Sequence, residues 1–290
     1  MVGRADLSPP RPRRVSRPYP TITMKTNFHT HTTFCDGKDS AEAMVEAAIA
    51  KGFSAIGFSS HSDMVADLSA YRAEIARLRA ASAGRIRVFC GLELELAKAI
   101  PSEVLGATPD GRRPTCGTGD GTFDYLIGSH HFITASDGGF FAIDNSPDEL
   151  AKGIRDHFDG DAVAFVKAYY AALRSTLSLD FEIVGHPDLV RKFNVKHPYF
   201  DETADWYRAE LVKTAEAIAA SGKIVEVNTG AISRGWIDDA YPSAEFRALL
   251  RARGVRFILS SDAHAAAAID CAFDRFGAAE NYVATPWGDR

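Results

Sequence analysis

The sequence predicts an α/β fold in which seven parallel strands alternate with helices. Strand-like and helix-like segments alternate from Thr23 onward, which is typical of a parallel sheet. Several strand-like segments are nearly continuous apolar runs, as expected when both faces of a sheet are covered. These two observations fit a closed barrel and an open doubly wound sheet equally. The third observation, a polar side chain at the end of every predicted strand, favours the barrel, because parallel strand ends converge there on one face.

The predicted strands follow from short apolar or alternating segments. They cover residues 22–31, 53–60, 86–96, 123–133, 181–186, 223–228 and 255–264. The first alternates apolar and polar residues, which indicates a strand with one buried face. A glycine- and proline-rich connection at 97–121 separates the third strand from the fourth and is too irregular for a regular element.

The predicted helices have apolar residues at helical spacing and recognisable ends. They cover residues 39–52, 68–84, a segment that opens at Ser146, 162–179, 201–222 and 243–254. Asp39 or Ser40 is the N-cap of the first helix, and glycines end the first helix and the one at 201–222. Pro147 and Glu149 give the Ser146 helix a proline at its first position and a capping-box glutamate.

The composition is that of an ordinary globular protein. The chain has 290 residues, of which 46% are hydrophobic and 24% charged, and its formal net charge is −5. The length allows one large α/β barrel or two smaller domains. We expect no nucleic acid and no membrane as a partner, since the chain is acidic and lacks an apolar run of the roughly 20 residues that a membrane span needs. Homo-oligomer formation stays open.

The first 22 residues differ from the rest. They hold five arginines and five prolines with almost no aliphatic residues, so we expect a flexible tail at 1–22 and a single barrel over 23–290. The four cysteines are scattered, which favours reduced thiols in a cytoplasmic protein. Cys35 lies close to two histidines and is an alternative metal ligand, although a free cysteine is more often a small buried hydrophobe.

The strand ends carry a set of side chains suited to metal binding. In chain order they are His29 and His31, His61, Glu93, His131, His186, Asn228, and Asp262 with His264. Residues i and i+2 of a strand point to the same side, so His29 with His31 and Asp262 with His264 can each reach a common centre. Imidazoles and carboxylates together suit zinc, iron or manganese, and the number of side chains predicts two or three ions. An isolated histidine at any of these positions would more often be structural.

Neighbouring candidates differ in the side of the strand that they face. Because His130 and His131 are adjacent, an extended strand turns only one of them inward. We choose His131 as the ligand and interpret His130 as either a packing residue or a side chain that contacts a ligand from outside the metal site. Glu93 lies nearer the expected strand end than Glu95, which we interpret as an outer contact.

Together these residues resemble the polymerase and histidinol phosphatase (PHP) superfamily. The matching motifs run in order across about residues 25–265 and are His29-x-His31-Thr32 with Asp36-Gly37, His61-Ser62-Asp63, Gly91-Leu92-Glu93, Gly185-His186-Pro187-Asp188, Glu226-Val227-Asn228-Thr229 and Ser261-Asp262-Ala263-His264. Three further motifs resemble the histidinol-phosphate phosphatase branch. These are residues 128–133, 143–147 and 188–193.

The resemblance implies a distorted seven-stranded TIM-like barrel, a trinuclear metal centre and hydrolysis of a phosphate monoester. The implied metal ligands are His29, His31, Asp36, His61, Glu93, His131, His186, Asp262 and His264, with Glu93 bridging two ions. The sequence departs from the family pattern at His130, where relatives often have a small apolar residue, and at Asp36, where some relatives have histidine.

The implied substrate is L-histidinol phosphate, a small phosphorylated amino alcohol of histidine biosynthesis. Bound metals lower the pKa of a water toward ~7, so we expect a metal-bridging hydroxide to attack phosphorus and Asp262 or a nearby histidine such as His264 to protonate the leaving oxygen. Arg191 and Arg234 follow site strands and suit phosphate oxygens. Lys192 and Ser129 complete the predicted substrate-binding set.

Two other functions remain as alternatives. One is a PHP phosphoesterase for another small ester or a nucleotide, although a nuclease would favour a basic groove with aromatic side chains that stack on bases. The other is a metal-binding regulatory barrel without activity, against which the complete ligand set argues.

Overall fold

The computed structural model describes residues 24–100, 104, 123–276 and 282–287. The predicted tail at 1–22 and most of the 97–121 connection therefore lie outside the described residues. Among the described residues, no helix combines the length and apolar composition that crossing a membrane requires.

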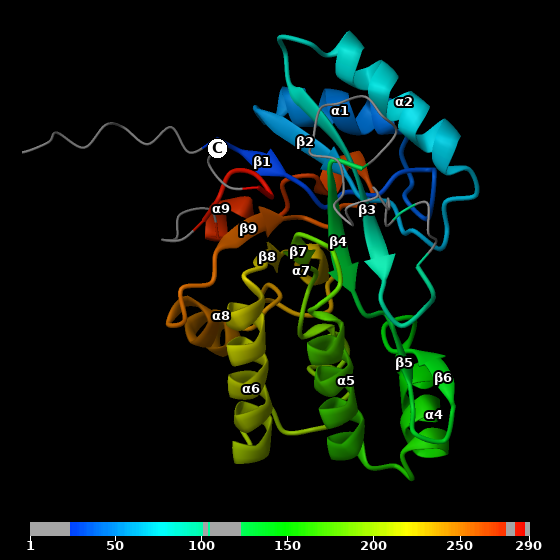
Figure 1. Cartoon of the computed structure of the whole chain (residues 1–290), viewed down its shortest axis with the longest axis vertical. Helices are drawn as coiled ribbons and strands as arrows, with labels where there is room; N and C mark the ends of the chain where they lie inside the picture. The colour runs from blue at the N-terminus through cyan, green and yellow to red at the C-terminus, as the bar shows by residue number, and fades with distance from the viewer. Residues whose placement is uncertain (1–23, 101–103, 105–122, 277–281, 288–290) are drawn as a thin grey trace, which may run out of the picture.

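The central feature is a parallel sheet of seven strands that curves into a nearly closed barrel, as Figure 1 shows. Its strands in spatial order are β1 (Thr26–Asn27), β2 (Ala55–Phe58), β3 (Arg87–Glu95), β4 (Tyr125–Ser129), β7 (Ile183–Val184), β8 (Ile224–Asn228) and β9 (Phe257–Ser260). Spatial order follows chain order, as expected when each strand is connected to the next by a crossover. The predicted α/β barrel is confirmed.

The first and last strands meet at a seam that is thinly hydrogen-bonded. Thr30 and Ala263, just beyond β1 and β9, form an isolated parallel bridge, and the His31 N–H donates to the Ala263 carbonyl at 2.9 Å. The side-chain amide of Asn27 adds a hydrogen bond to Ser261 Oγ at 2.6 Å. The barrel is thus closed at this seam mainly by individual contacts rather than by a continuous ladder.

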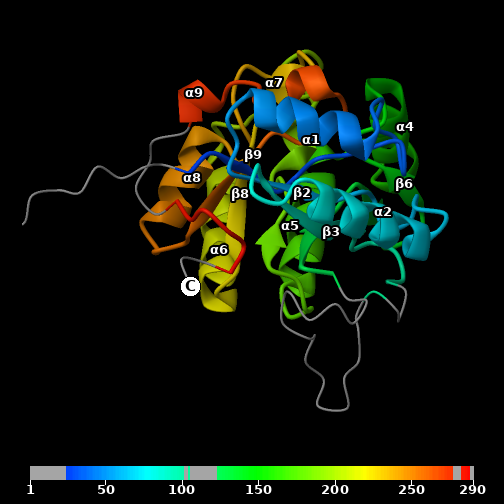
Figure 2. The same cartoon turned by 90° about the horizontal axis from the view of Figure 1, so that it is seen from above.

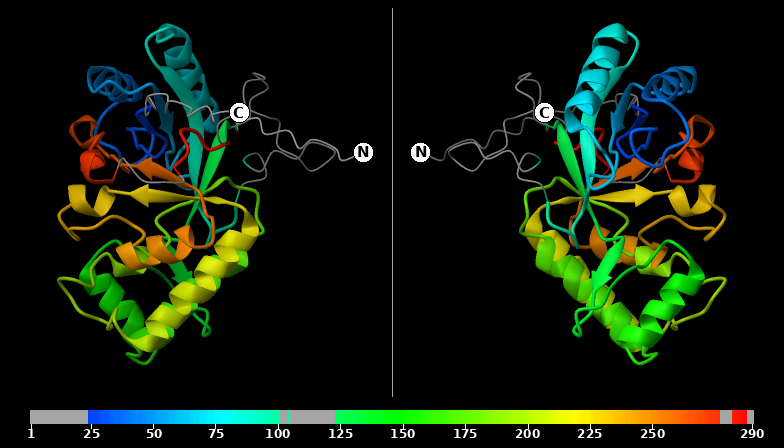
Figure 3. Two further views of the ribbon diagram at one scale, coloured as in Figure 1. Left: turned by 90° about the vertical axis from the view of Figure 1, so that its left-hand side faces the viewer. Right: turned by 90° about the vertical axis from the view of Figure 1, so that its right-hand side faces the viewer.

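Helices surround the barrel, as Figures 2 and 3 show from three further directions. They are α1 (Ala41–Ala50), α2 (Leu68–Ala81), α4 (Pro147–His157), α5 (Ala162–Thr176), α6 (Asp205–Ser221), α7 (Gly230–Ser233), α8 (Ala244–Arg251) and α9 (Phe273–Phe276), with short 3₁₀ turns η1 (Leu189–Arg191) and η2 (Ala266–Ala268). The caps follow the sequence: Ser40 Oγ accepts from Ala43 N–H, and Ser146 Oγ from Glu149 N–H. Each such cap satisfies a backbone donor that the first helical turn leaves free.

The predicted strand at 123–133 is in fact two elements. β4 ends at Ser129, and β5 (Phe132–Thr134) pairs antiparallel with β6 (Phe140–Ala142) in a hairpin outside the barrel. The chain turns between them because Glu95 accepts hydrogen bonds from both the backbone N–H and the ring of His131. An apolar run alone did not reveal this turn, since the group that causes it lies on β3.

Apolar side chains form two clusters on opposite faces of the sheet. The larger lies between the strands and the helices. The smaller fills the barrel interior near the amino ends of the strands and consists of Phe28, Ala55, Tyr125, Ile127, Ile183, Ile224 and Ile258, with Phe89, Val283 and Trp287 packed against it. The interior nearer the carboxyl ends of the strands is left to polar side chains.

Candidate metal centre

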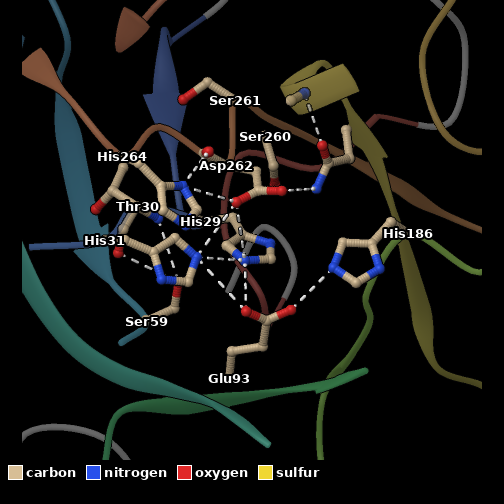
Figure 4. A network of polar contacts seen from close by, with 12 residues as sticks. His29, Thr30, His31, Ser59, Glu93, His186, Ser260, Ser261, Asp262 and His264 are labelled. Carbon is tan, nitrogen blue, oxygen red and sulfur yellow. Dashed lines mark hydrogen bonds and ion pairs between the residues drawn. The ribbon is translucent and has the colours of Figure 1, made fainter. Parts of the chain in front are cut away.

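The predicted ligands converge at the carboxyl ends of the strands, as Figure 4 shows for the residues that it labels. His29 and His31 directly follow β1, His61 follows β2, and His186 follows β7. Glu93 lies within β3, while Asp262 and His264 follow β9. Most of these residues lie in turns just past the strand ends. The strands therefore fix where the residues lie, but the alternation of a strand does not restrict the direction of their side chains.

Glu93 stands at the centre of the group, and both its oxygens face imidazole nitrogens. The distances from Oε2 are 3.1 Å to His61 Nδ1, 3.2 Å to His29 Nε2 and 3.5 Å to His31 Nε2, and those from Oε1 are 2.9 Å to His186 Nε2 and 3.4 Å to His131 Nε2. Burial raises the pKa of Glu93, but the surrounding histidines, His29 foremost, bring it well below its ordinary value. The carboxylate is therefore ionised at neutral pH.

The arrangement fits metal ions. Four overlapping groups have ligand atoms within 4.8 Å of one another: His31, Asp36, His61 and His264; His29, His186 and Asp262; His29, His31 and Glu93; and His61, Glu93 and His131. Glu93 Oε2 is buried and has no hydrogen-bond partner among the described residues, an arrangement that is costly unless something else satisfies the atom. Mixed nitrogen and oxygen donors suit zinc, iron or manganese. The nine predicted ligands are thus brought together.

Asp36 lies at the outer edge of this group. Its side chain is 38% exposed, and its Oδ2 is 3.1 Å from His264 Nε2. Its Oδ1 is 3.7 Å from His31 Nδ1 and 3.8 Å from His61 Nε2. Cys35, the alternative ligand, also approaches, with Sγ 3.5 Å from His31 Nδ1. The Cys35 thiol is not in any of the four groups, however, and burial raises its pKa, which disfavours the thiolate that binds metals.

Two buried carboxylates support the histidines from behind. Glu226 Oε2 lies 2.8 Å from His29 Nδ1, and Glu226 Oε1 accepts from the backbone N–H of His186 at 2.7 Å. Glu95 Oε2 lies 3.1 Å from His131 Nδ1, in agreement with its interpretation as an outer contact. A partner on the second ring nitrogen fixes the orientation of a metal-binding histidine. Sequence reasoning gave Glu226 no role, although a glutamate within the apolar strand at 224–228 was a usable signal.

Six of the nine predicted ligands line one wall of a pocket of about 240 Å³. Its lining residues are Asp36, His61, His131, Asp144, Asn145, His186, Leu189, Lys192, Ala231, Arg234, Tyr241, Asp262 and His264. The Arg234 guanidinium donates to Asp262 Oδ1 at 3.1 Å and lies 2.9 Å from His264 Nδ1. Lys192 also lines the pocket. Of the three predicted phosphate-binding cations, Arg234 and Lys192 thus line the pocket beside the candidate ligands.

Tyr241 is a pocket residue that sequence reasoning missed. Its side chain is buried, and its hydroxyl has no hydrogen-bond partner among the described residues. Tyr241 lies in the segment between α7 and α8, and no local sequence motif marks it. A buried hydroxyl that lines a pocket is available to bind a ligand.

The structure does not bring Arg191 or Ser129 to the pocket wall. Arg191 is buried, with Nε donating to Glu202 at 2.5 Å and Nη1 to Asp188 at 3.3 Å. Ser129 is buried inside the barrel and is not a lining residue. The expected phosphate contact of Arg191 is therefore not supported: its guanidinium is paired with the carboxylates of Glu202 and Asp188. His130 is in none of the four ligand groups, and its Nε2 lies 3.0 Å from Thr176 Oγ1.

The chain is similar to proteins of one family. It is 27% identical over 265 residues to the "Probable histidinol-phosphatase" of Deinococcus radiodurans, covering 84% of this chain and 87% of that protein. It is 23% identical over 275 residues to the histidinol-phosphatase of Bacillus subtilis, covering 87% and 98%.

Solved structures share the fold. A Listeria monocytogenes protein assigned as a histidinol phosphatase superposes with a TM-score of 0.72 at 19% identity, covering 87% of this chain and all of that one. The histidinol phosphate phosphatase of Lactococcus lactis, complexed with zinc, L-histidinol and phosphate, gives a TM-score of 0.58 at 21% identity over 84% of this chain and 87% of that one. The PHP domain model matches residues 27–230, and the chain therefore belongs to the PHP domain family.

Proposed function

We propose that this protein is a metal-dependent phosphate monoesterase that hydrolyses L-histidinol phosphate to L-histidinol and phosphate. The observation that carries the proposal is the convergence of the ligand side chains around Glu93, on one wall of a pocket that Arg234 and Lys192 also line. The names of the relatives support the substrate, and the zinc, L-histidinol and phosphate bound to the Lactococcus lactis protein support the cofactor and the ligand class.

The four ligand groups would hold two or three divalent ions, with zinc, iron or manganese as candidates. Such ions, when bound, offset the charge of phosphate oxygens and lower the pKa of a coordinated water. The side chains of the chain itself have the tasks of holding the phosphate in place and managing protons.

Arg234 and Lys192 are the cations that would bind phosphate oxygens turned away from the ligand wall. The planar guanidinium of Arg234 is held by Asp262, so it is oriented before substrate arrives. This fixed orientation reduces the entropy lost on binding.

Asp262 and His264 are the side chains considered for protonating the leaving oxygen. Burial raises the pKa of Asp262, but Arg234 and His29 bring it well below its ordinary value, so Asp262 holds no proton at neutral pH. It can orient His264, whose Nδ1 lies 3.5 Å away. Asp262 and a neighbouring histidine such as His264 stay the two candidates for protonating the leaving oxygen.

A side-by-side assay tests the proposal. L-Histidinol phosphate, nucleoside monophosphates and p-nitrophenyl phosphate are offered to the purified protein, and the metal content of the same sample is measured. We expect the highest kcat/KM for L-histidinol phosphate, with two or three equivalents of metal. A preference for a nucleotide would establish the alternative phosphoesterase, and bound metal without turnover of any ester would establish the regulatory barrel.

A further inference from the structure

The pocket wall outside the metal ligands contains one acidic side chain among the described lining residues. The pocket residues that are not predicted ligands are Asp144, Asn145, Leu189, Lys192, Ala231, Arg234 and Tyr241. Lys192 and Arg234 suit an anion, whereas Asp144 would repel a phosphate dianion. A carboxylate on this wall therefore needs a different explanation.

Asp144 is held at a fixed place beside the metal centre. It follows β6 and precedes Ser146, the N-cap of α4. The backbone N–H of its neighbour Ile143 donates to the His131 carbonyl at 2.8 Å. Lys192 Nζ binds the Asp144 carbonyl oxygen at 2.6 Å and Oδ2 at 3.0 Å. Lys192 thus holds the Asp144 side chain at Oδ2, and the backbone bond of Ile143 holds Asp144 close to the predicted ligand His131.

The other oxygen of Asp144 is available to a ligand. Oδ1 accepts no hydrogen bond from the residues that the structure describes, and the side chain is 21% exposed within the pocket lining. A carboxylate offers about four acceptor positions, of which Lys192 takes only one. The free positions call for a donor, and a positively charged donor forms the strongest hydrogen bond there.

We propose that Asp144 is the specificity-determining residue that binds the ammonium group of the substrate. The inference rests on the proposed function, because L-histidinol phosphate carries its ammonium on the carbon next to the phosphorylated CH2, so that the cation lies close to the phosphate dianion. The metal centre, Arg234 and Lys192 receive the phosphate, and Asp144, which contacts Lys192, receives the neighbouring ammonium through its free oxygen. Esters without a cation lose this contact and should be poor substrates.

The test compares two enzymes on two substrates. L-Histidinol phosphate is assayed beside its des-amino analogue, which differs only in the ammonium group, with the wild-type protein and with Asp144→Asn. The asparagine keeps the shape of the side chain, and Lys192 keeps its hydrogen bond to the backbone carbonyl. A charge-assisted hydrogen bond corresponds to roughly a 10- to 100-fold effect. We expect Asp144→Asn to lower kcat/KM by about that factor for the amino substrate and to leave the des-amino ester nearly unchanged.

A matched control is Asp148→Asn, four residues farther on, in the first turn of α4, exposed and outside the pocket lining. This variant should leave kcat/KM unchanged for both esters. If the wild-type protein hydrolyses both esters equally, or if Asp144→Asn slows both by one factor, the assignment of Asp144 is overturned while the phosphatase activity stands. If the wild-type protein hydrolyses neither ester, the proposed function fails and the Asp144 proposal fails with it.

Discussion

The two halves of the barrel interior use opposite chemistry within one sheet. Near the amino ends of the strands the interior is an apolar cluster built around Phe28, Tyr125 and Ile224. Near the carboxyl ends it is a group of imidazoles and carboxylates around Glu93. The change occurs within one i, i+2 step on β8, from Ile224 to Glu226, since alternate residues of a strand face the same side.

The apolar half also positions the polar half. The Tyr125 hydroxyl is shared between the carbonyl oxygens of Phe28, at 2.6 Å, and Phe58, at 3.0 Å. Phe28 directly precedes His29, and Phe58 ends the strand that leads to the His61 turn. A Cβ at Gly57 would lie 2.4 Å from the Tyr125 hydroxyl, so a glycine is needed there to admit the ring. The apolar half therefore fixes where the ligand-bearing turns lie, and the polar half supplies the side chains that suit metal ions.

The largest expected effect comes from removing a ligand of the polar half. Asp262→Ala or His29→Ala should lower kcat by at least ~1000-fold and reduce bound metal, because Asp262 belongs to one ligand group and His29 to two. Metal analysis and turnover of L-histidinol phosphate measure both effects. His197→Ala, on the exposed surface, is the matched control. Full activity in either ligand variant would contradict the metal-centre assignment.

A smaller effect is expected from the carboxylate behind the ligands. Glu226→Gln keeps the shape but weakens the hydrogen bond to His29 Nδ1, so metal affinity should fall by roughly 10- to 100-fold. Metal titration of the metal-free protein measures this. Excess metal should restore much of the activity of this variant, whereas it should not rescue Asp262→Ala. An unchanged affinity would show that Glu226 has only a packing role.

Changing the apolar half should affect stability more than metal binding. Tyr125→Phe removes the hydroxyl that donates to these two carbonyl oxygens and should lower the free energy of unfolding by about 0.5–1.5 kcal/mol. Metal content at saturating metal should stay at the wild-type level. Thermal unfolding of the metal-loaded protein measures the first effect. A variant with wild-type Tm would separate the two halves more completely than we infer.

The smallest expected effect is the pH dependence of the metal-free protein. Burial lowers the pKa of His131, but Glu93 and Glu95 raise it, to about 10. A histidine with a raised folded-state pKa contributes stability that is fully present below its unfolded value of 6.5 and is lost as the pH rises toward 10. The Tm of the metal-free protein should therefore fall between pH 7 and pH 9. His131→Asn should flatten this dependence, and a Tm that rises over this range would exclude it.

Local patterns were sufficient to predict most of the fold and eight of the nine candidate ligands, whereas Asp36 came only from the family resemblance. Periodicity and caps such as Ser40 and Ser146 are local, and strand ends converge in any parallel barrel. Contacts between distant segments were not predictable in this way. Glu95 turns the chain after β4, and Asp188 with Glu202 binds Arg191 away from the pocket. Position five residues past His186 placed Arg191 near the site but did not give the direction of its side chain.

The thin seam between β1 and β9 has a consequence for the order of assembly. The ligands on its two sides are far apart in the chain: Asp36 and His264, which lie 3.1 Å apart, are separated by 228 residues. An ion bound by both residues would connect the segment after β1 to the segment after β9. The unfolded chain would bind it only weakly, because the loop between them must first close. Metal uptake is therefore expected late in folding, and removal of metal should loosen amide protection first at His31, whose N–H donates across the seam to the Ala263 carbonyl.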